Sequence, residues 1–147
     1  MQVRVISPDM YTYGAMLIGG IARDAGFDVC ISHELAAQKG ETVLLSLYST
    51  LHLLDPRIRN FIRGHRRDGG SCYAGGPVSA YPGMVMGELE LDALVLGEGE
   101  ETVLSLLIEG PGTETAGIAF RDADGIRINP SPRSEERRVG KECRSRW

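Results

Sequence analysis

The stretch Asp92-Ala93-Leu94-Val95-Leu96-Gly97-Glu98-Gly99-Glu100-Glu101-Thr102-Val103 decides the fold. An apolar run stops at a glycine, passes through alternating Gly and Glu, and returns as an apolar periodic pattern. This order predicts a buried strand, a tight turn and a helix whose first turn is acidic, which suits the positive end of the helix dipole. Ligand crevices in open α/β sheets form where strands end, so function is expected at this turn. An ordinary strand-to-helix connection is the alternative.

Upstream of this stretch, apolar runs alternate with helical patterns. Strands are predicted near residues 3–7, 27–32, 42–47, 71–75 and 93–97, and helices over about 12–25, 56–64 and 83–89. Asp55 and Pro56 provide the cap and first position of the second helix, and Gly26 ends the first. The pattern predicts an α/β fold, a doubly wound five-stranded parallel sheet with right-handed crossovers. A flavodoxin-like strand order, 2-1-3-4-5, would place loops 7–13 and 46–52 at the topological switch point.

The alternation of strand and helix patterns ends before residues 115–130. These residues have the pattern of an apolar strand, an Asp-Gly turn and a second strand, which predicts a β-hairpin. An isolated hairpin is marginally stable, so this one is expected to dock on another element. The predicted organisation is therefore an α/β domain over 1–114, a hairpin segment over 115–132 and a separate tail over 133–147.

Charge separates that tail from the rest of the chain. The tail holds six of the 16 basic residues and only three of the 20 acidic ones, so the first 132 residues carry a net charge of −7. Such an acidic domain does not favour nucleic acid, because phosphate neutralisation needs clustered Lys and Arg. The tail resembles a read-through peptide of non-native origin, with a basic binding arm as the alternative. No apolar run is long enough for a membrane span and no secretory signal is recognisable, so a cytoplasmic location is expected.

Small and hydroxyl-bearing residues follow the third, fourth and fifth predicted strands. They are the candidate binding residues: Ser46, Ser49, Thr50, Gly75, Gly76, Pro77, Gly97, Glu98 and Gly99. Hydroxyls can hydrogen-bond phosphate, ribose or amide groups, and bare backbone lets a flat ligand lie close. A bulky side chain at Gly76 is therefore expected to block the ligand and leave the sheet intact. A capping role is favoured for at least one of the glutamates at the turn.

Other motifs argue against several kinds of chemistry. The first loop lacks the G-x-G-x-x-G fingerprint, and the chain has no Walker motif, which speaks against nucleotide hydrolysis. His52 is expected at the surface or at a cap, and His33 and His65 in polar surroundings, so no catalytic residue is nominated. Cys30 and Cys72 are expected as buried thiols within strands, and with Cys143 they lack metal-cluster spacing, so no metal ligand is nominated.

Three motifs together carry a family resemblance. They are Gly-Gly-Pro from Gly75, Asp-x-Leu-Val-x-Gly-Glu-Gly-Glu-x-Thr from Asp92, and Gly-Ile-Ala-Phe-Arg-Asp-x-Asp-Gly from Gly117. With five strands before them, they resemble the N-terminal cobalamin-binding domain of cobalamin-dependent radical S-adenosylmethionine enzymes, over about residues 1–130. The resemblance implies a Rossmann-type cobalamin-binding fold, with cobalamin and a radical domain as partners.

The resemblance also implies what the chain leaves to other parts of such an enzyme. The family's radical domain binds a [4Fe-4S] cluster and S-adenosylmethionine through C-x-x-x-C-x-x-C, which this chain lacks, so a fragment cut before that domain is expected. The D-x-H-x-x-G motif of methionine-synthase-type domains has no His here, which implies cobalamin without a protein His on cobalt. Methyl transfer or rearrangement is the implied reaction. A stand-alone flavodoxin-like module that binds a small ligand or nucleotide for regulation is the alternative.

Overall fold

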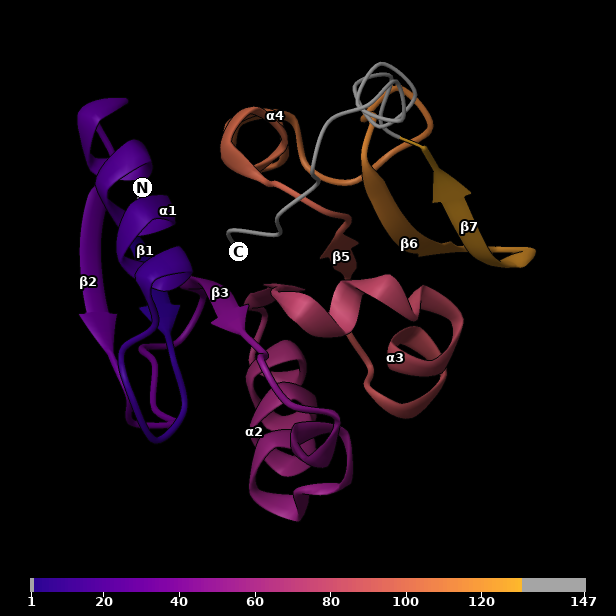
Figure 1. Cartoon of the computed structure of the whole chain (residues 1–147), viewed down its shortest axis with the longest axis horizontal. Helices are drawn as coiled ribbons and strands as arrows, with labels where there is room; N and C mark the ends of the chain where they lie inside the picture. Colours follow the sequence, from indigo (N-terminus) through magenta and orange to yellow (C-terminus); the bar gives the residue numbers. More distant parts are fainter. Residues whose placement is uncertain (1, 131–147) are drawn as a thin grey trace, which may run out of the picture.

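The computed structural model describes residues 2–130, and the tail at 133–147, with Cys143, lies outside them. Seven strands form one sheet in the order β2-β1-β3-β4-β5-β6-β7 (Figure 1). The strands are β1 (Gln2–Ile6), β2 (Asp28–Ser32), β3 (Thr42–Ser46), β4 (Ser71–Gly75), β5 (Ala93–Val95), β6 (Ile118–Asp122) and β7 (Gly125–Asn129). The first five are parallel in the order 2-1-3-4-5, which confirms the predicted topology. Strand β5 is shorter than predicted.

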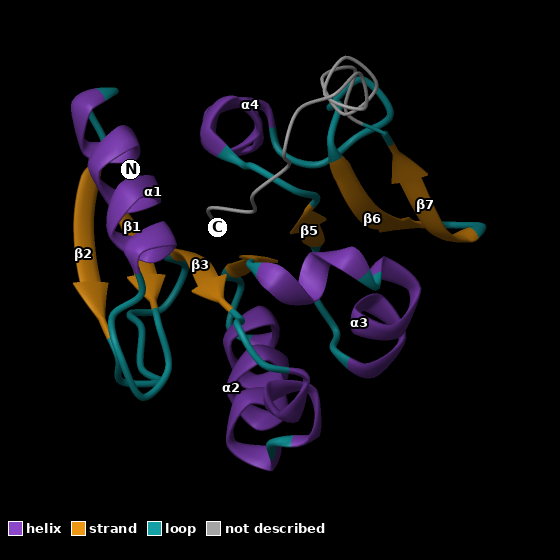
Figure 2. Cartoon of the chain, in the orientation of Figure 1, coloured by secondary structure: helices purple, strands orange, loops and turns teal. Residues whose placement is uncertain are grey.

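Helices cover both faces of the parallel part (Figure 2). The helices are α1 (Tyr13–Asp24), α2 (Pro56–Arg67), α3 (Pro82–Glu88) and α4 (Glu100–Glu109), and the short 3-10 helices are η1 (Thr50–Leu54) and η2 (Pro77–Ala80). Helices α1 and α4 share one apolar core with the sheet, and α2 and α3 share the other. Alternate residues of β3 enter the two cores, Leu44 on the α1 side and Leu45 on the α2 side. This two-sided burial explains why β3 reads as a continuous apolar run.

The caps of α1 and α2 follow the sequence signals. The Asp55 carboxylate accepts a hydrogen bond from the backbone N–H of Arg57 at 2.9 Å, and Pro56 follows as the first helical residue. Helix α1 is followed by Gly26 at a φ of 100°, and Gly19 brings α1 close to β2. An added Cβ at Gly19 would lie 2.6 Å from Cδ1 of Ile31. This glycine therefore permits a close approach of helix to sheet.

The hairpin docks on the sheet, as its own marginal stability requires. Strand β6 pairs antiparallel with β5, and β7 pairs antiparallel with β6. Arg121 of β6 donates hydrogen bonds to the backbone carbonyls of Met86 and Leu89, which fastens β6 to the end of α3. The Asn129 side chain donates to the carbonyl of Thr115 at 2.9 Å and so ties β7 to the preceding loop. The hairpin thus extends the same sheet.

The two cysteines of the described residues lie in different environments. Cys72 is fully buried in β4, as predicted, and burial raises the pKa of its thiol to about 12. The expectation for Cys30 was wrong, because its side chain is exposed. Strand β2 is an edge strand, and Cys30 shares a sheet face with its register partner Arg4, away from the apolar side that packs on α1.

Among residues 2–130, no helix combines the length and apolar character that crossing a lipid bilayer would require.

Shortening one buried side chain of β3 tests how much the central strand contributes to the stability of the fold. Leu45→Ala should lower the free energy of unfolding by about 2–5 kcal/mol, because it leaves a cavity in the α2-side core. Urea titration followed by circular dichroism measures the loss. Leu51→Ala, at a side chain that is 73% exposed, is the matched control and should change stability by no more than about 0.5 kcal/mol. Equal losses in the two variants would contradict this account of the core.

Candidate functional site

Four loops meet where the parallel strands end, and they carry the candidate binding residues. Ser46 ends β3 and is the register partner of Gly75, which ends β4. Both residues are buried, as is Gly76 directly after them. Strand β5 ends beside them and leads through Gly97 to Gly99, the N-cap of α4. The structure therefore brings the candidates after β3, β4 and β5 to one edge of the sheet, called here the carboxyl edge.

Hydroxyl contacts join the loop after β1 to the loop after β3. The hydroxyls of Thr12 and Ser46 share a hydrogen bond of 3.1 Å, and Thr12 also accepts from the N–H of Ala15 as the N-cap of α1. The Tyr48 hydroxyl donates to the carbonyl of Pro8 at 2.7 Å. The Ser46 hydroxyl thus already has a protein partner.

A second set of contacts joins the loops after β4 and β5. Ser79 of η2 is buried, and its N–H donates to the carbonyl of Gly76 at 2.9 Å. Its hydroxyl accepts from the N–H of Gly97 at 3.3 Å. Gly97 has a φ of 66°, which turns the chain away from β5, and an added Cβ there would meet no atom within 4 Å. The carboxyl edge therefore has open space where a side chain of residue 97 would lie.

Gly76 has a different role from the expected one. Its φ is 120°, and an added Cβ would overlap the backbone carbonyl of Leu47. Leu47 also donates its N–H to the carbonyl of Gly75 at 2.8 Å, so the two loops touch backbone to backbone. The expectation that a bulky residue at Gly76 leaves the sheet intact was wrong, because the added side chain would overlap the backbone of Leu47, which hydrogen-bonds the last residue of β4.

The remaining candidates lie around this contact. Ser49 is the N-cap of η1, where its hydroxyl accepts from the N–H of Leu51 at 3.2 Å. Thr50 and Pro77 are exposed as the first residues of η1 and η2. Glu98 precedes the cap of α4 and is half-buried. The cap position itself is Gly99, and Glu100 and Glu101 occupy the first turn of α4, as the dipole argument predicted.

Apolar side chains stand exposed on the segments that follow β1, β3 and β4. Their exposed fractions range from 51% to 73%: Met10, Tyr11, Tyr13, Leu51, Leu54 and Tyr81. Single exposed apolar residues are common on protein surfaces, whereas contiguous groups of them are typical of interaction sites. The carboxyl edge thus combines a row of small residues with apolar side chains around it.

His52 is buried, which corrects its predicted surface position. Its ring packs edge-on against Tyr48 with a centroid distance of 4.5 Å, and its Nδ1 has no hydrogen-bond partner among the described residues. Burial lowers the pKa of His52, an effect that the carboxylates of Asp9 and Asp55 oppose. The Nε2 atom lies 4.0 Å from Asp9. His65 is buried too, contrary to expectation, and its Nε2 lies 2.7 Å from the carbonyl of Glu41.

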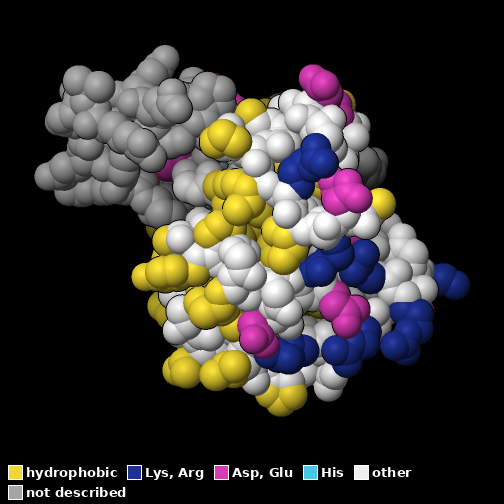
Figure 3. All heavy atoms as spheres, turned by 90° about the vertical axis from the view of Figure 1, so that its right-hand side faces the viewer, with side chains coloured by type: hydrophobic (Ala, Val, Ile, Leu, Met, Phe, Trp, Pro, Cys, Tyr) yellow, Lys and Arg dark blue, Asp and Glu magenta, His cyan; other side chains and the backbone are white. Residues whose placement is uncertain are grey.

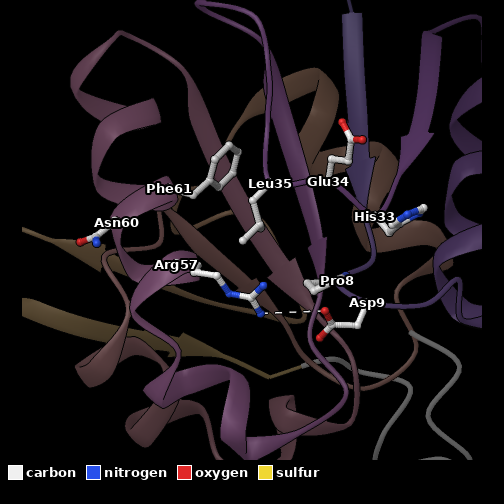
Figure 4. A pocket seen from close by; sticks show the side chains of 8 residues that line it. All are labelled: Pro8, Asp9, His33, Glu34, Leu35, Arg57, Asn60 and Phe61. Atoms are coloured by element: carbon white, nitrogen blue, oxygen red, sulfur yellow. Dashed lines mark ion pairs between the residues drawn. The ribbon is translucent and has the colours of Figure 1, made fainter.

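A cavity of about 670 Å³ opens between the loops after β1 and β2 and helix α2 (Figure 4). Asp9 and Arg57 face each other across it, with 3.9 Å between carboxylate and guanidinium. Asp9 has a φ of 68°, which a non-glycine residue rarely adopts. The lining residues are Pro8, Asp9, His33, Glu34, Leu35, Arg57, Asn60 and Phe61. None of them is a candidate from the sequence.

Sequence reasoning did not name Thr12, Ser79 or His52 as binding candidates, although the loops 7–13 and 46–52 predicted at the switch point contain Thr12 and His52. Thr12 had a usable signal, because a threonine directly before a helical pattern is a typical N-cap. Ser79 gave none, because its hydroxyl bonds the N–H of Gly97, which lies 18 residues away in sequence. Within residues 2–130, no three His, Cys, Asp or Glu side chains gather in a way that could hold a metal ion.

Gly76→Ala should destabilise the fold by about 1–3 kcal/mol, because the new Cβ meets the Leu47 carbonyl and the φ of 120° is strained. Denaturant unfolding measures the loss. Gly83→Ala in α3 is the matched control, since an added Cβ there meets no atom within 4 Å. The control should be neutral or stabilising by up to about 1 kcal/mol. A neutral Gly76→Ala would contradict the close approach.

Protonation of His52 should weaken the fold. The folded state holds the pKa of His52 below its ordinary value of 6.5, so between the two pKa values the unfolded state binds more protons. Stability is therefore full above about pH 6.5 and falls as the pH drops through the lowered folded pKa. Urea midpoints from about pH 8 to about pH 5 measure this slope. His52→Leu should make the unfolding stability depend less steeply on pH. His33→Leu, at an exposed histidine, is the control and should leave the pH dependence unchanged. The reverse result would refute the assignment of the pH dependence to His52.

Comparison with known proteins gives one sequence relative and a set of structural neighbours. No family model matches the chain. The chain is 39% identical over 135 residues to "Putative methylthiotransferase MJ0865" of Methanocaldococcus jannaschii, a match that covers 88% of this chain and 29% of the relative. The chain thus spans less than a third of that relative's length.

Two structures of the radical S-adenosylmethionine methyltransferase TsrM from Kitasatospora setae share the fold. One, with tryptophan substrate and an S-adenosylmethionine analogue bound, has a TM-score of 0.70 at 18% identity over 88% of this chain and 30% of TsrM. The other, with cobalamin and a [4Fe-4S] cluster bound, has a TM-score of 0.68 at 17% identity over 89% of this chain and 29% of TsrM. The comparisons confirm the resemblance that the sequence motifs carry, namely that this chain is similar to the N-terminal cobalamin-binding domain of cobalamin-dependent radical S-adenosylmethionine enzymes.

Proposed function

We propose that this chain is a cobalamin-binding domain of a radical S-adenosylmethionine enzyme and that cobalamin binds at the carboxyl edge. The observation that carries the proposal is the row of small residues at the ends of β3, β4 and β5, surrounded by exposed apolar side chains. Open α/β sheets bind ligands at this edge. A TsrM structure with a similar fold has cobalamin bound, which adds support.

The residues at this edge fit a large ligand with a flat, partly apolar body and a polar tail. Gly97 is exposed and leaves open space where a side chain would otherwise stand. Tyr11, Leu51 and Tyr81, exposed at three different loops, offer apolar contact to the body of such a ligand. Backbone groups next to glycine and the hydroxyls of the loop after β3 offer hydrogen bonds to its polar parts.

Each candidate residue has a proposed part in holding the cofactor. Ser49 and Thr50 would contact its polar tail from the loop after β3, and the buried Ser46 would hold that loop in place through its hydrogen bond with Thr12. Gly75, Gly76 and Pro77 would form the floor after β4, and Gly97, Glu98 and Gly99 would border the ligand after β5. When bound, cobalamin would supply a cobalt centre able to carry a methyl group. The domain itself would place and orient that cofactor for methyl transfer or rearrangement.

We propose further that the radical chemistry belongs to a separate domain. Residues 1–114 would form the cobalamin-binding unit, and the segment 115–132, with its hairpin, would lead toward a radical domain. S-adenosylmethionine and a [4Fe-4S] cluster would be bound in that domain. In support, the two TsrM structures contain an S-adenosylmethionine analogue and a [4Fe-4S] cluster, in a chain about three times as long as the part matched here.

The cavity beside α2 favours a second candidate function. Its eight lining residues and volume of about 670 Å³ suit a small ligand, as expected for a flavodoxin-like regulatory module. The cavity lies on the α2 side of the loop after β1, whereas the glycine row lies after β4 and β5. Perturbation of His33 and Phe61 by flavin mononucleotide in NMR spectra, without binding of cobalamin, would favour this second function.

A cobalamin titration tests the proposal. Hydroxocobalamin should bind the wild-type chain in calorimetry and shift its own visible absorption spectrum. Thr50→Trp adds bulk at an exposed position of the carboxyl edge and should weaken binding at least about tenfold, or about 1.4 kcal/mol.

Ile108→Trp is the matched control for added bulk. Ile108 is 70% exposed near the end of α4, at the opposite edge of the sheet, so this variant should bind like the wild type. Circular dichroism establishes that all three proteins are folded. Equal affinities would remove the loop after β3 from the site, and a folded wild type that does not bind would refute the proposal.

A further inference from the structure

Among residues 2–130, strand β7 is an edge of the sheet, with one row of its backbone groups unpaired by any strand. Its hairpin has a two-residue turn closed by the pair of Asp122 and Gly125. In an antiparallel ladder hydrogen-bonded pairs alternate, so Gly125, Arg127 and Asn129 direct their backbone groups toward β6. Ile126 and Ile128 therefore direct theirs outward. No other strand of residues 2–130 pairs with this side of β7.

The side chains of the same two isoleucines are also exposed. Ile126 is opposite Arg121 and Ile128 is opposite Ala119, which places both isoleucines on the α3 face of the sheet. Their exposed fractions are 42% and 49%. Figure 3 shows hydrophobic side chains gathered on the face of the molecule that includes this edge. An unpaired edge strand with branched apolar side chains is a template for another strand.

The opposite face of β7 carries a charge pair. Arg127 lies on the α4 face, opposite Phe120, and its Nε is 2.8 Å from a carboxylate oxygen of Asp122. The single cation at the centre of β7 thus has an anion beside it. This pair lowers the cost of bringing two such strands together.

We propose that β7 pairs with β7 of a second copy of this chain, antiparallel, with Arg127 on the two-fold axis. Ile126 then lies opposite Ile128 of the second copy, and Ile128 opposite Ile126. Because both residues direct their backbone groups outward, each pair exchanges two hydrogen bonds, four in all. The two seven-stranded sheets become one continuous sheet, and four isoleucines meet on its α3 face.

The sequence of β7 selects this register over its neighbours. A shift that places Ile126 on the axis leaves the groups of Ile128 opposite the hairpin turn. A shift that places Ile128 on the axis sets Ile126 opposite Pro130, which has no N–H to donate. Only the register centred on Arg127 satisfies all four outward groups. In this register the Arg127 residues of the two copies lie opposite each other on the α4 face, and Asp122 of each copy offsets the positive charge of the guanidinium groups.

Sedimentation equilibrium of the 147-residue chain at a series of concentrations tests the dimer. The wild type should dimerise, and Ile128→Pro should weaken dimerisation at least about tenfold because it removes one outward N–H per chain. The β6 ladder does not use that N–H, so the variant keeps its hairpin. Ile128→Val is the matched control, because it retains the N–H and a branched side chain and should still dimerise.

Disulfide trapping tests the register and does not depend on Ile128→Pro folding. In a Cys30→Ser, Cys143→Ser background, Arg127→Cys places two thiols across a non-hydrogen-bonded pair, where Cα atoms are about 4.5 Å apart. Mild oxidation should give a covalent dimer at least about ten times faster than it does with Ile126→Cys. In the proposed register residue 126 lies opposite residue 128 of the second copy, so the two cysteines of that variant are not directly opposite each other. A monomeric wild type, equal trapping rates for the two cysteines, or unweakened dimers of a folded Ile128→Pro would each overturn the proposal.

Discussion

The carboxyl edge depends on one backbone contact, the approach of the Leu47 carbonyl to the α-carbon of Gly76. A side chain at residue 76 would force apart the loops after β3 and β4, and with them the hydrogen bond from Leu47 to Gly75. Ser79 connects the same turn to the loop after β5, because its N–H donates to the carbonyl of Gly76 and its hydroxyl accepts from the N–H of Gly97. The loops after β3, β4 and β5 are thus held in place by contacts that pass through a single glycine.

This contact also changes how the glycines of the edge are interpreted. A Gly-Gly pair after a buried strand suggests a surface on which a ligand lies, but Gly76 is required by the fold itself. Gly97 is the residue whose missing side chain leaves free space. A loss of binding in a Gly76 variant would therefore not distinguish a damaged loop from a blocked ligand. Thr50, which is exposed and caps nothing, gives a cleaner probe.

The sequence predicts the fold well because its signals are local and repeated. Five apolar runs, the Asp55-Pro56 helix start and Gly26 each act within a few residues, and the strand order follows from the usual topology of such units. The environments of single residues were harder to predict. Cys30 is exposed because β2 is an edge strand. His52 and His65 are both buried, and His65 contacts the carbonyl of Glu41, which lies 24 residues away in sequence. The candidates after β3, β4 and β5 do meet at one edge, but the partners that fix them, Thr12 and Ser79, come from tertiary contacts.

The antiparallel hairpin has a consequence for how a larger protein could be built on this domain. Strand β6 runs from the carboxyl edge to the opposite edge of the sheet, and β7 runs back toward the carboxyl edge. Strand β7 therefore points in the same direction as the parallel strands. The hydrogen bonds from Leu96 to Gly117 and from Gly117 to Asn129 set these three residues in one row across the sheet. A polypeptide that continues from Asn129 therefore departs level with the turn at Gly97, on the side of the molecule where the loops gather. A neighbouring domain joined there needs no long tether to reach a molecule held at those loops.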